Sequence, residues 1–355
     1  MIRYVPFLKA KRNEIKAIGE LAPEVAAGIC PFFDFPRKVG GYEEAEFAAA
    51  VDRVARSLQI NLPEDYTFYL DNFDVEEALR VGGQHNYSYL LNAVAGLDAI
   101  PVVGLDRSAA HRQSVVRLKR SGVIASPDVA LRLSVEDFED FAVVANDLAT
   151  DLAPVFAEFE SVHLVFDTRI CTELDPAATA LQIRQFSRRF CAAYPVRRVI
   201  VTGSSIPASI SDILRVDSVR TLPRHELAIY ARVRANHAHA PLVFGDYATV
   251  SPNYSDVSIA PEIMQNVMTA KLTYTIDGAH YFIRGGGMRA NGAQQYFAMA
   301  RTLCAEDFFR GRGYSAGDAY LEQKSRGHGG NCGPNTVIKP AVVAHITYMV
   351  REAPI

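Results

Sequence analysis

The sequence contains no tryptophan and only five cysteines among its 355 residues. The cysteines are odd in number and form no Cys-X-X-Cys pair, so neither a disulfide framework nor a structural zinc site is predicted. The lack of tryptophan removes an aromatic platform on which an enzyme can hold a sugar ring. This absence argues against a carbohydrate-cleaving enzyme.

Long hydrophobic runs and an excess of one charge are missing as well. No uncharged apolar stretch approaches the roughly 20 residues that span a bilayer. The first residues lack the regions of a signal peptide, so we expect a cytoplasmic protein without membrane contact. The chain carries 37 basic and 40 acidic residues, a formal net charge of −3. Any nucleic-acid contact therefore needs a local basic patch, and the modest charge suits an oligomer.

The motifs of several large enzyme classes do not occur. The sequence has no GxSxG nucleophile turn, no HExxH zinc motif and no GxxxxGK[ST] phosphate loop. It is nevertheless the sequence of a folded protein, since 49% of its residues are hydrophobic. The function must therefore be sought in how the fold places its polar residues.

Short apolar runs alternate with helical patterns along the first 254 residues. A continuous apolar run is typical of a buried parallel strand, and a period near 3.6 is typical of the helix that follows it. We expect strands at 4–8, 28–33, 67–70, 100–104, 129–133, 162–166, 199–202 and 242–245. We expect helices at 12–21, 43–57, 86–97, 108–121, 135–159, 177–194 and 226–236. Eight strands predict an α/β fold, a (β/α)8 TIM-like barrel at 1–254, with a doubly wound open sheet as the main alternative.

The pattern changes after residue 254. Two alternating runs, 271–277 and 280–284, flank Asp277-Gly278, which is the strongest short-range signal for a β-hairpin. The further expected elements are helices at 293–305 and 317–324 and a final apolar segment at 337–350. We therefore predict a C-terminal α+β elaboration, a hairpin plus helices, at 255–355 and packed on the barrel.

Ionisable residues follow almost every predicted strand. In barrel enzymes the reactive groups lie at the carboxyl ends of the strands, because the loops gather there. We expect Asp71, Asp167 and Asp246 to converge at the barrel mouth as catalytic groups and to bind Mg²⁺, which takes oxygen ligands. The substrate-binding residues expected beside them are Lys9, Lys11, Arg132, Arg169 and Tyr247. The alternative is a ring of ion pairs that closes the top of the barrel.

Short motifs carry a resemblance to a known family. They are Tyr4-Val5-Pro6-Phe7-Leu8-Lys9-Ala10-Lys11, Phe244-Gly245-Asp246-Tyr247, Gly317-Asp318 with Gly330-Asn331, and His345-Ile346-Thr347. With them the chain resembles the phage and bacterial family of beta proteins over nearly its whole length. The resemblance implies one architecture from residue 1 to 355, in which the C-terminal segment returns to the barrel.

A returning C-terminal segment would add residues to the barrel mouth. Asp318 and Asn331 would then contact substrate. His345 would be the general acid or base, since the pKa of an ordinary histidine lies near 6.5. The alternative for His345 is a buried structural histidine, hydrogen-bonded within its apolar segment.

Two functions follow from these observations. The first is a barrel enzyme, a hydrolase or lyase, that acts at the barrel mouth on a phosphate-bearing substrate such as a nucleotide or a nucleic-acid end. The second is a non-catalytic binding or regulatory protein that contacts a protein or nucleic-acid partner. The resemblance implies that such a binding protein is of phage or mobile-element origin. Its surface would include the hairpin at 271–284, where the aromatic and arginine residues of 281–284, like those of 308–312, suggest an exposed patch. The alternative is that both runs are core faces with one solvated arginine each.

Overall fold

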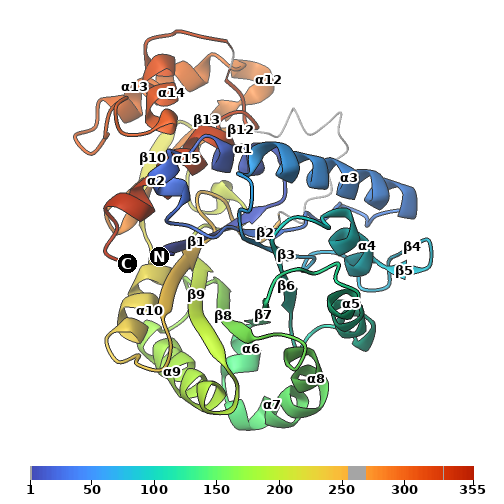
Figure 1. Ribbon diagram of the computed structural model, residues 1–355. Coiled ribbons are helices and arrows are strands. Elements are labelled where there is room, and N and C mark those ends of the chain that lie inside the picture. Colours follow the sequence, from blue (N-terminus) through green and yellow to red (C-terminus); the bar gives the residue numbers. More distant parts are fainter. Residues whose placement is uncertain (1, 255–268, 331) are drawn as a thin grey trace.

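Eight parallel strands close into a barrel (Figure 1). The computed structural model describes residues 2–254, 269–330 and 332–355. The barrel strands follow one another in chain order, and β1 closes the ring by pairing with β11. They are β1 (Tyr4–Lys9), β2 (Phe32–Asp34), β3 (Phe68–Asp71), β6 (Ala99–Val103), β7 (Asp128–Leu133), β8 (Ser161–Ile170), β9 (Val196–Ser204) and β11 (Leu242–Asp246). The predicted (β/α)8 barrel is confirmed.

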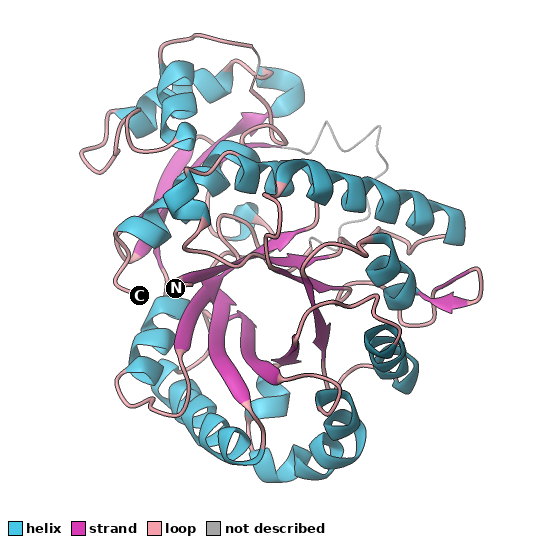
Figure 2. Ribbon diagram, viewed as in Figure 1, coloured by secondary structure: helices cyan, strands magenta, loops and turns pink. Residues whose placement is uncertain are grey.

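Helices surround the barrel strands (Figure 2). They are α1 (Arg12–Gly19), α2 (Pro23–Ala26), α3 (Glu44–Asn61), α4 (Asn86–Ala93), α5 (Ala109–Arg120), α6 (Val135–Phe138), α7 (Phe141–Asp147), α8 (Ala153–Phe156), α9 (Pro176–Ala193) and α10 (His225–Arg234). None of the helices in the described part of the chain is long and apolar enough to cross a membrane.

Several predicted elements have different bounds in the structure, and for two of them a proline is involved. The second strand begins at Phe32 rather than at residue 28, because Pro31 has no N–H to donate to a neighbouring strand. The helix predicted over 135–159 is divided into α6, α7, a π-helical turn at Leu148–Leu152 and α8. Pro154 lies in the first turn of α8, where a missing N–H does not break a helical hydrogen bond.

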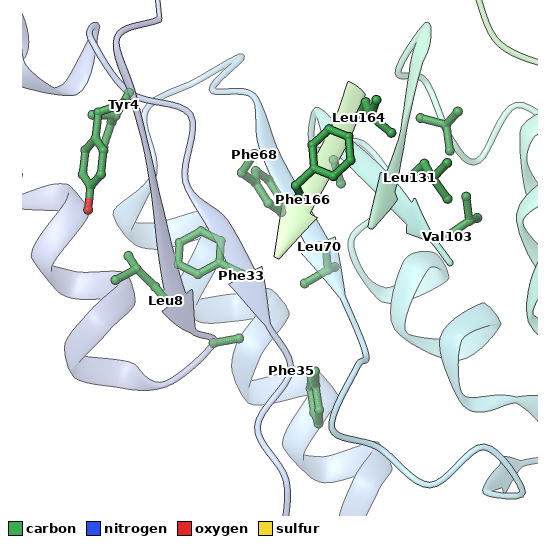
Figure 3. Packing of buried hydrophobic residues seen from close by; sticks show 14 of the residues in the cluster. Tyr4, Leu8, Phe33, Phe35, Phe68, Leu70, Val103, Leu131, Leu164 and Phe166 are labelled. Atoms are coloured by element: carbon green, nitrogen blue, oxygen red, sulfur yellow. The ribbon is translucent and has the colours of Figure 1, made fainter. Parts of the chain in front are cut away.

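The core forms two layers because side chains alternate along each strand. One set points toward the helices, and Figure 3 shows Leu8, Phe33 and Leu70 among its members. The other set fills the barrel interior, where the rings of Phe7 and Phe32 stack with centroids 4.3 Å apart. The carboxyl end of this interior carries polar rather than apolar residues, and they are described below.

The C-terminal part is built on a three-stranded antiparallel sheet. The hairpin strands β12 (Thr269–Ile276) and β13 (Ala279–Gly287) flank the predicted turn at Asp277-Gly278, where Gly278 has φ 63°. The third strand, β10 (Ser218–Pro223), pairs with β13 and was not predicted. It is short and mostly exposed, and its Val219 and Leu222 do not form a continuous apolar run. Because β10 lies between β9 and α10 in the chain, the sheet joins the two parts of the molecule.

Four further helices lie in the described residues of the C-terminal part, and the last one returns to the barrel. They are α12 (Met288–Asn291), α13 (Gln295–Cys304), α14 (Ala316–Ser325) and α15 (Ile338–Arg351). Helix α15 lies against α1 and β12 (Figure 1), and it is buried along most of its length. The smaller elements are the strand pair β4 (Arg80–Val81) and β5 (Gln84–His85) and a 3-10 turn at Ile210–Asp212.

Gly317 allows α14 to approach α15 closely. A Cβ atom at this position would lie 2.8 Å from the backbone nitrogen of Ala344 and closer still to the carbonyl oxygen of Pro340. We expect Gly317→Ala to lower the free energy of unfolding by about 1–3 kcal/mol, because backbone atoms of a buried helix must move. Urea denaturation measures this change. Gly313→Ala is the control, since its Cβ would meet nothing within 4 Å; equal stability of both variants would contradict the prediction.

Candidate functional site

The guanidinium of Arg132 holds three carboxylates together inside the barrel. Its Nη1 lies 2.7 Å from Asp34 Oδ1 and 2.8 Å from Asp71 Oδ2, and its Nη2 lies 2.6 Å from Asp167 Oδ2. Tyr247 donates a hydrogen bond of 2.6 Å to the same Asp167 oxygen. All five residues are at most 3% exposed. Side chains along each barrel strand point alternately inward and outward, and these five point inward at the same level. Residues far apart in the sequence therefore meet on the barrel axis.

The ring of Phe73 lies beside this cluster, in contact with three arginines. The guanidinium carbons of Arg107, Arg132 and Arg169 lie 4.9, 4.4 and 4.6 Å from the centre of its ring. Arg107 also reaches Asp71, at 3.1 Å. Each carboxylate of the cluster therefore faces a cation, which is the arrangement of the alternative hypothesis, a ring of ion pairs across the top of the barrel.

The charges around Asp34 show how the cluster is balanced. Burial by itself raises the pKa of this carboxyl, but Arg132 and Lys9 outweigh burial, and the pKa lies below its ordinary value. The carboxylate is thus held in its charged form. A buried charge of this kind is tolerated only when it is paired.

The carboxylate cluster does not fit a divalent cation. Arg132 occupies the space among Asp34, Asp71 and Asp167 and supplies the positive charge that Mg²⁺ would bring. Within the described ranges, no group of three or more His, Cys, Asp or Glu residues is placed to hold a metal ion. Binding of Mg²⁺ stays a prediction, and this geometry does not favour it.

Asp246 lies apart from Asp71 and Asp167. Along β11 its neighbour Phe244 packs in the outer layer, while Val243 and Tyr247 belong to the inner one. By alternation the Asp246 side chain points out of the barrel, toward α15. The sequence placed it correctly at a strand end but did not reveal on which face it lies, because a shift of one residue reverses the face.

Asp246 is the centre of a second buried polar network. It accepts hydrogen bonds from Tyr4 and pairs with Arg224, and its Oδ1 lies 3.0 Å from Nε2 of His345. Burial tends to raise the pKa of this carboxyl, but His345 and Arg224 lower it well below the ordinary value. Arg224 also pairs with Glu226 at 2.9 Å. The network therefore ties β1, β11 and α15 together.

His345 has the contacts of a buried structural histidine. Its Nδ1 lies 2.6 Å from Thr275 Oγ1 of the hairpin, and the residue is 1% exposed. Burial lowers its pKa, so the ring is neutral at pH 7, and the permanent cation opposite Asp246 is Arg224. A proton-transfer role at the barrel mouth stays a prediction, and the network places the ring away from the Arg132 cluster.

The other predicted residues lie in different places. Asp318 accepts a hydrogen bond of 2.6 Å from Tyr274 within the C-terminal part, so it joins neither cluster. Asn331 lies outside the described residues. The expected exposed patch on the hairpin is wrong, because Tyr281, Phe282 and Ile283 are at most 6% exposed.

A pocket of about 420 Å³ opens near the barrel mouth. It lies between the start of α1, the loops that follow β9 and β11, and the hairpin. The basic residues Lys9, Lys11, Arg12 and Lys271 line it, and Glu14 is its one acidic residue among those described. The pocket therefore gathers positive charge in a chain whose overall charge is slightly negative.

The cations of the pocket differ in how they are held. The Nζ of Lys9 is fixed by Asp74 at 2.8 Å and by the Pro252 carbonyl at 3.1 Å. Lys9 and Lys11 also lie over the ring of Tyr254, at 4.5 and 5.3 Å from its centre. The side chain of Lys271 is exposed at the pocket. The surrounding protein takes the place of part of the water around its ammonium group, and this desolvation lowers the pKa of Lys271. Of the predicted substrate-binding cations, Lys9 and Lys11 thus reach the pocket, whereas Arg132 does not.

Glu14 is the residue of this site that sequence reasoning missed. Its carboxylate accepts a hydrogen bond of 2.6 Å from the backbone N–H of Lys9. Burial raises its pKa to about 7, although Lys11 and Lys9 pull in the opposite direction. The spacing Lys9-x-Lys11-x-x-Glu14 offered a signal, because a turn from a strand into a helix brings these positions together.

A family model described as Beta protein matches residues 4–351 of the chain. The chain belongs to the Beta protein family. The family that the sequence motifs suggested is therefore confirmed. No curated protein matches the chain.

Five residues of the motifs that carry the likeness to the Beta protein family have two structural roles. Tyr4, Asp246 and His345 meet in the buried network that fixes α15 to the barrel. Lys9 and Lys11 line the cationic pocket instead. In this Beta protein family member, the motif residues thus connect the C-terminal helix to the strand that supplies the pocket.

Proposed function

We propose that the protein is a hydrolase that cleaves a phosphate ester in the pocket beside the barrel mouth. The observation that carries this proposal is the placement of one buried carboxyl group, Glu14, in the wall of a pocket lined by four basic residues. The cations attract a phosphate-bearing substrate, and the carboxyl group exchanges a proton with it.

The basic residues have separate roles in binding. Lys9 is held by Asp74 and the Pro252 carbonyl, so its side chain loses little entropy on binding, but part of its charge is already balanced by Asp74. Lys11, Arg12 and Lys271 have no carboxylate partner among the residues that the structure describes, and a phosphate group would supply one. Ammonium and guanidinium groups form strong, charge-assisted hydrogen bonds to phosphate oxygens.

Glu14 acts as the general acid. Water attacks the phosphorus atom, and the bond between phosphorus and the leaving oxygen breaks. Protonated Glu14 gives its proton to that oxygen, which leaves as an alcohol. One proton of the attacking water remains on the phosphate, and the other passes to Glu14 and restores its protonated form. A general acid works best when its pKa lies near the operating pH, and the pKa of Glu14 is about 7.

We expect Glu14→Gln to lower the turnover of a phosphate ester by about 100-fold or more, since general acid catalysis contributes 10²–10⁴-fold. Release of inorganic phosphate from p-nitrophenyl phosphate and from a nucleotide panel measures turnover. Binding of the substrate should persist, because glutamine keeps the hydrogen bond from the Lys9 N–H. Glu20→Gln, on the exposed end of the same helix, is the control.

Glu14→Gln should also change how the free energy of unfolding depends on pH. The folded-state pKa of Glu14 is raised from 4.5 to about 7, so ionising it in the folded protein becomes costly as the pH rises through this window. A shift of this size corresponds to about 3 kcal/mol. Glu14→Gln should therefore raise the free energy of unfolding at pH 8 but not at pH 4. Unchanged turnover together with this pH dependence of stability would overturn the catalytic role and favour the non-catalytic binding hypothesis.

A further inference from the structure

A second hollow adjoins the cationic pocket. It has a volume of about 550 Å³ and runs between α1 and α3, and Lys11 and Arg12 line both hollows. We call this second hollow the α1–α3 groove. Because the two share a wall at the start of α1, one extended ligand can occupy both.

The α1–α3 groove is bordered by further unpaired cations. Lys16, Arg53 and Arg56 line it, and the described residues provide none of them with a carboxylate partner. No acidic residue is found among the described residues that line the groove. Arg120, by contrast, is paired with Glu158 at 2.6 Å. The groove therefore concentrates uncompensated positive charge next to the pocket.

The floor of the groove is apolar. Ile15 and Val54 lie buried beneath it, Tyr42 is half-buried at its side, and Ile60 is 71% exposed at its rim. A ligand that matches both features carries regularly spaced negative charges and flat apolar groups. Single-stranded nucleic acid has both, because its phosphates track a basic groove while its unpaired bases pack on apolar and aromatic side chains.

We propose that the α1–α3 groove binds the chain of a single-stranded nucleic acid whose terminal phosphate lies in the cationic pocket. The inference rests on the proposed function for the pocket and names the substrate class. A duplex does not fit this description, since its bases are stacked inside and cannot reach the groove floor. Lys11 and Arg12, at the junction, contact the phosphate between the terminal nucleotide and the next one.

The test compares ligands of different length on the full chain. Fluorescence anisotropy measures binding of a ten-nucleotide oligothymidine with a terminal phosphate, in 5′- and 3′-phosphorylated forms labelled at the other end. Thymidine monophosphate, inorganic phosphate, the matching duplex and polyglutamate serve as competitors. The expected result is that the oligonucleotide binds at least about tenfold more tightly than the mononucleotide, with an affinity that falls steeply as salt rises.

Variants separate the groove from the pocket. Arg53→Gln/Arg56→Gln should weaken oligonucleotide binding by about tenfold or more and reduce its salt dependence, and leave mononucleotide binding unchanged. Lys271→Gln should weaken both ligands. Arg184→Gln/Arg188→Gln removes the same charge from α9 on another face of the molecule and should change neither.

The outcomes distinguish the two proposals. If the mononucleotide binds in a Lys271-dependent manner but the oligonucleotide binds no more tightly, the groove inference fails and the pocket proposal stands. If neither phosphate, mononucleotide nor oligonucleotide binds, both fail. Equal binding of the duplex or of polyglutamate would show that the groove recognises charge alone and would overturn the assignment to single-stranded nucleic acid.

Discussion

Replacing Arg132 by methionine is expected to lower the free energy of unfolding by about 3–5 kcal/mol, the range found when one partner of a buried ion pair is removed. The guanidinium lies within 2.6–2.8 Å of oxygens of Asp34, Asp71 and Asp167. Methionine fills much of the volume but leaves three buried carboxylates without their shared cation. Equilibrium denaturation at pH 7, followed by circular dichroism, measures the loss.

The pH dependence identifies the cause of this loss. In the wild-type protein the pKa of Asp34 lies below its ordinary value, so its contribution to stability is present above about pH 4 and is lost as the pH falls. In Arg132→Met the Asp34 carboxylate loses the cation that lowers its pKa, and the difference from wild type should shrink toward acidic pH. Arg120→Ala, in an exposed ion pair, is the control and should cost less than about 1 kcal/mol. A deficit that stays constant with pH would contradict an electrostatic origin.

Asp246→Ala is expected to cost about 3–5 kcal/mol of stability as well, and not to abolish ligand binding in the pocket. The substitution removes the carboxylate that pairs with Arg224 and that joins Tyr4 to His345. Arg224 then keeps one carboxylate partner, Glu226, in a fully buried position. Thermal and urea unfolding measure the change, together with phosphate binding by the folded fraction.

The free energy of unfolding at acidic pH gives a second measurement for the same residue. The pKa of Asp246 is depressed in the folded protein, so its stabilising effect is complete above about pH 4 and disappears as the pH falls below that value. Wild type and Asp246→Ala should therefore converge in acid. Asp52→Ala, on the exposed face of α3, is the control. An Asp246→Ala variant that melts like wild type but has no turnover would instead support the catalytic role expected from the sequence.

The barrel strands and the hairpin could be predicted because their sequence signals are local. Each barrel strand is a short apolar run followed by a helical pattern, and the hairpin is marked by Asp277-Gly278. The strand β10 gave no such signal, because it has no continuous apolar run. Its partner also lies some sixty residues later in the chain, with Ser218 opposite Arg284. Pairing of this kind is decided by tertiary contacts rather than by local preference.

The candidate site was predictable in part for a similar reason. The position of Lys9 and Lys11 after the first strand placed them at the carboxyl end of the barrel, where they line the pocket. Glu14 was missed because a glutamate in the first turn of a helix is ordinary in sequence. What marks Glu14 as a candidate is its burial and the hydrogen bond that its carboxylate accepts from the Lys9 N–H. Both depend on the tertiary structure.

The sequence by itself determined the barrel, the family and the concentration of charge at the strand ends. Only the tertiary structure decided how those charges are used. Arg132 draws Asp34, Asp71 and Asp167 into one neutralised cluster, whereas Asp246 faces outward and binds α15 through His345. The physical reason is that the energy of a buried charge depends on the partners within a few ångströms, and these partners come from strands and helices distant in the chain.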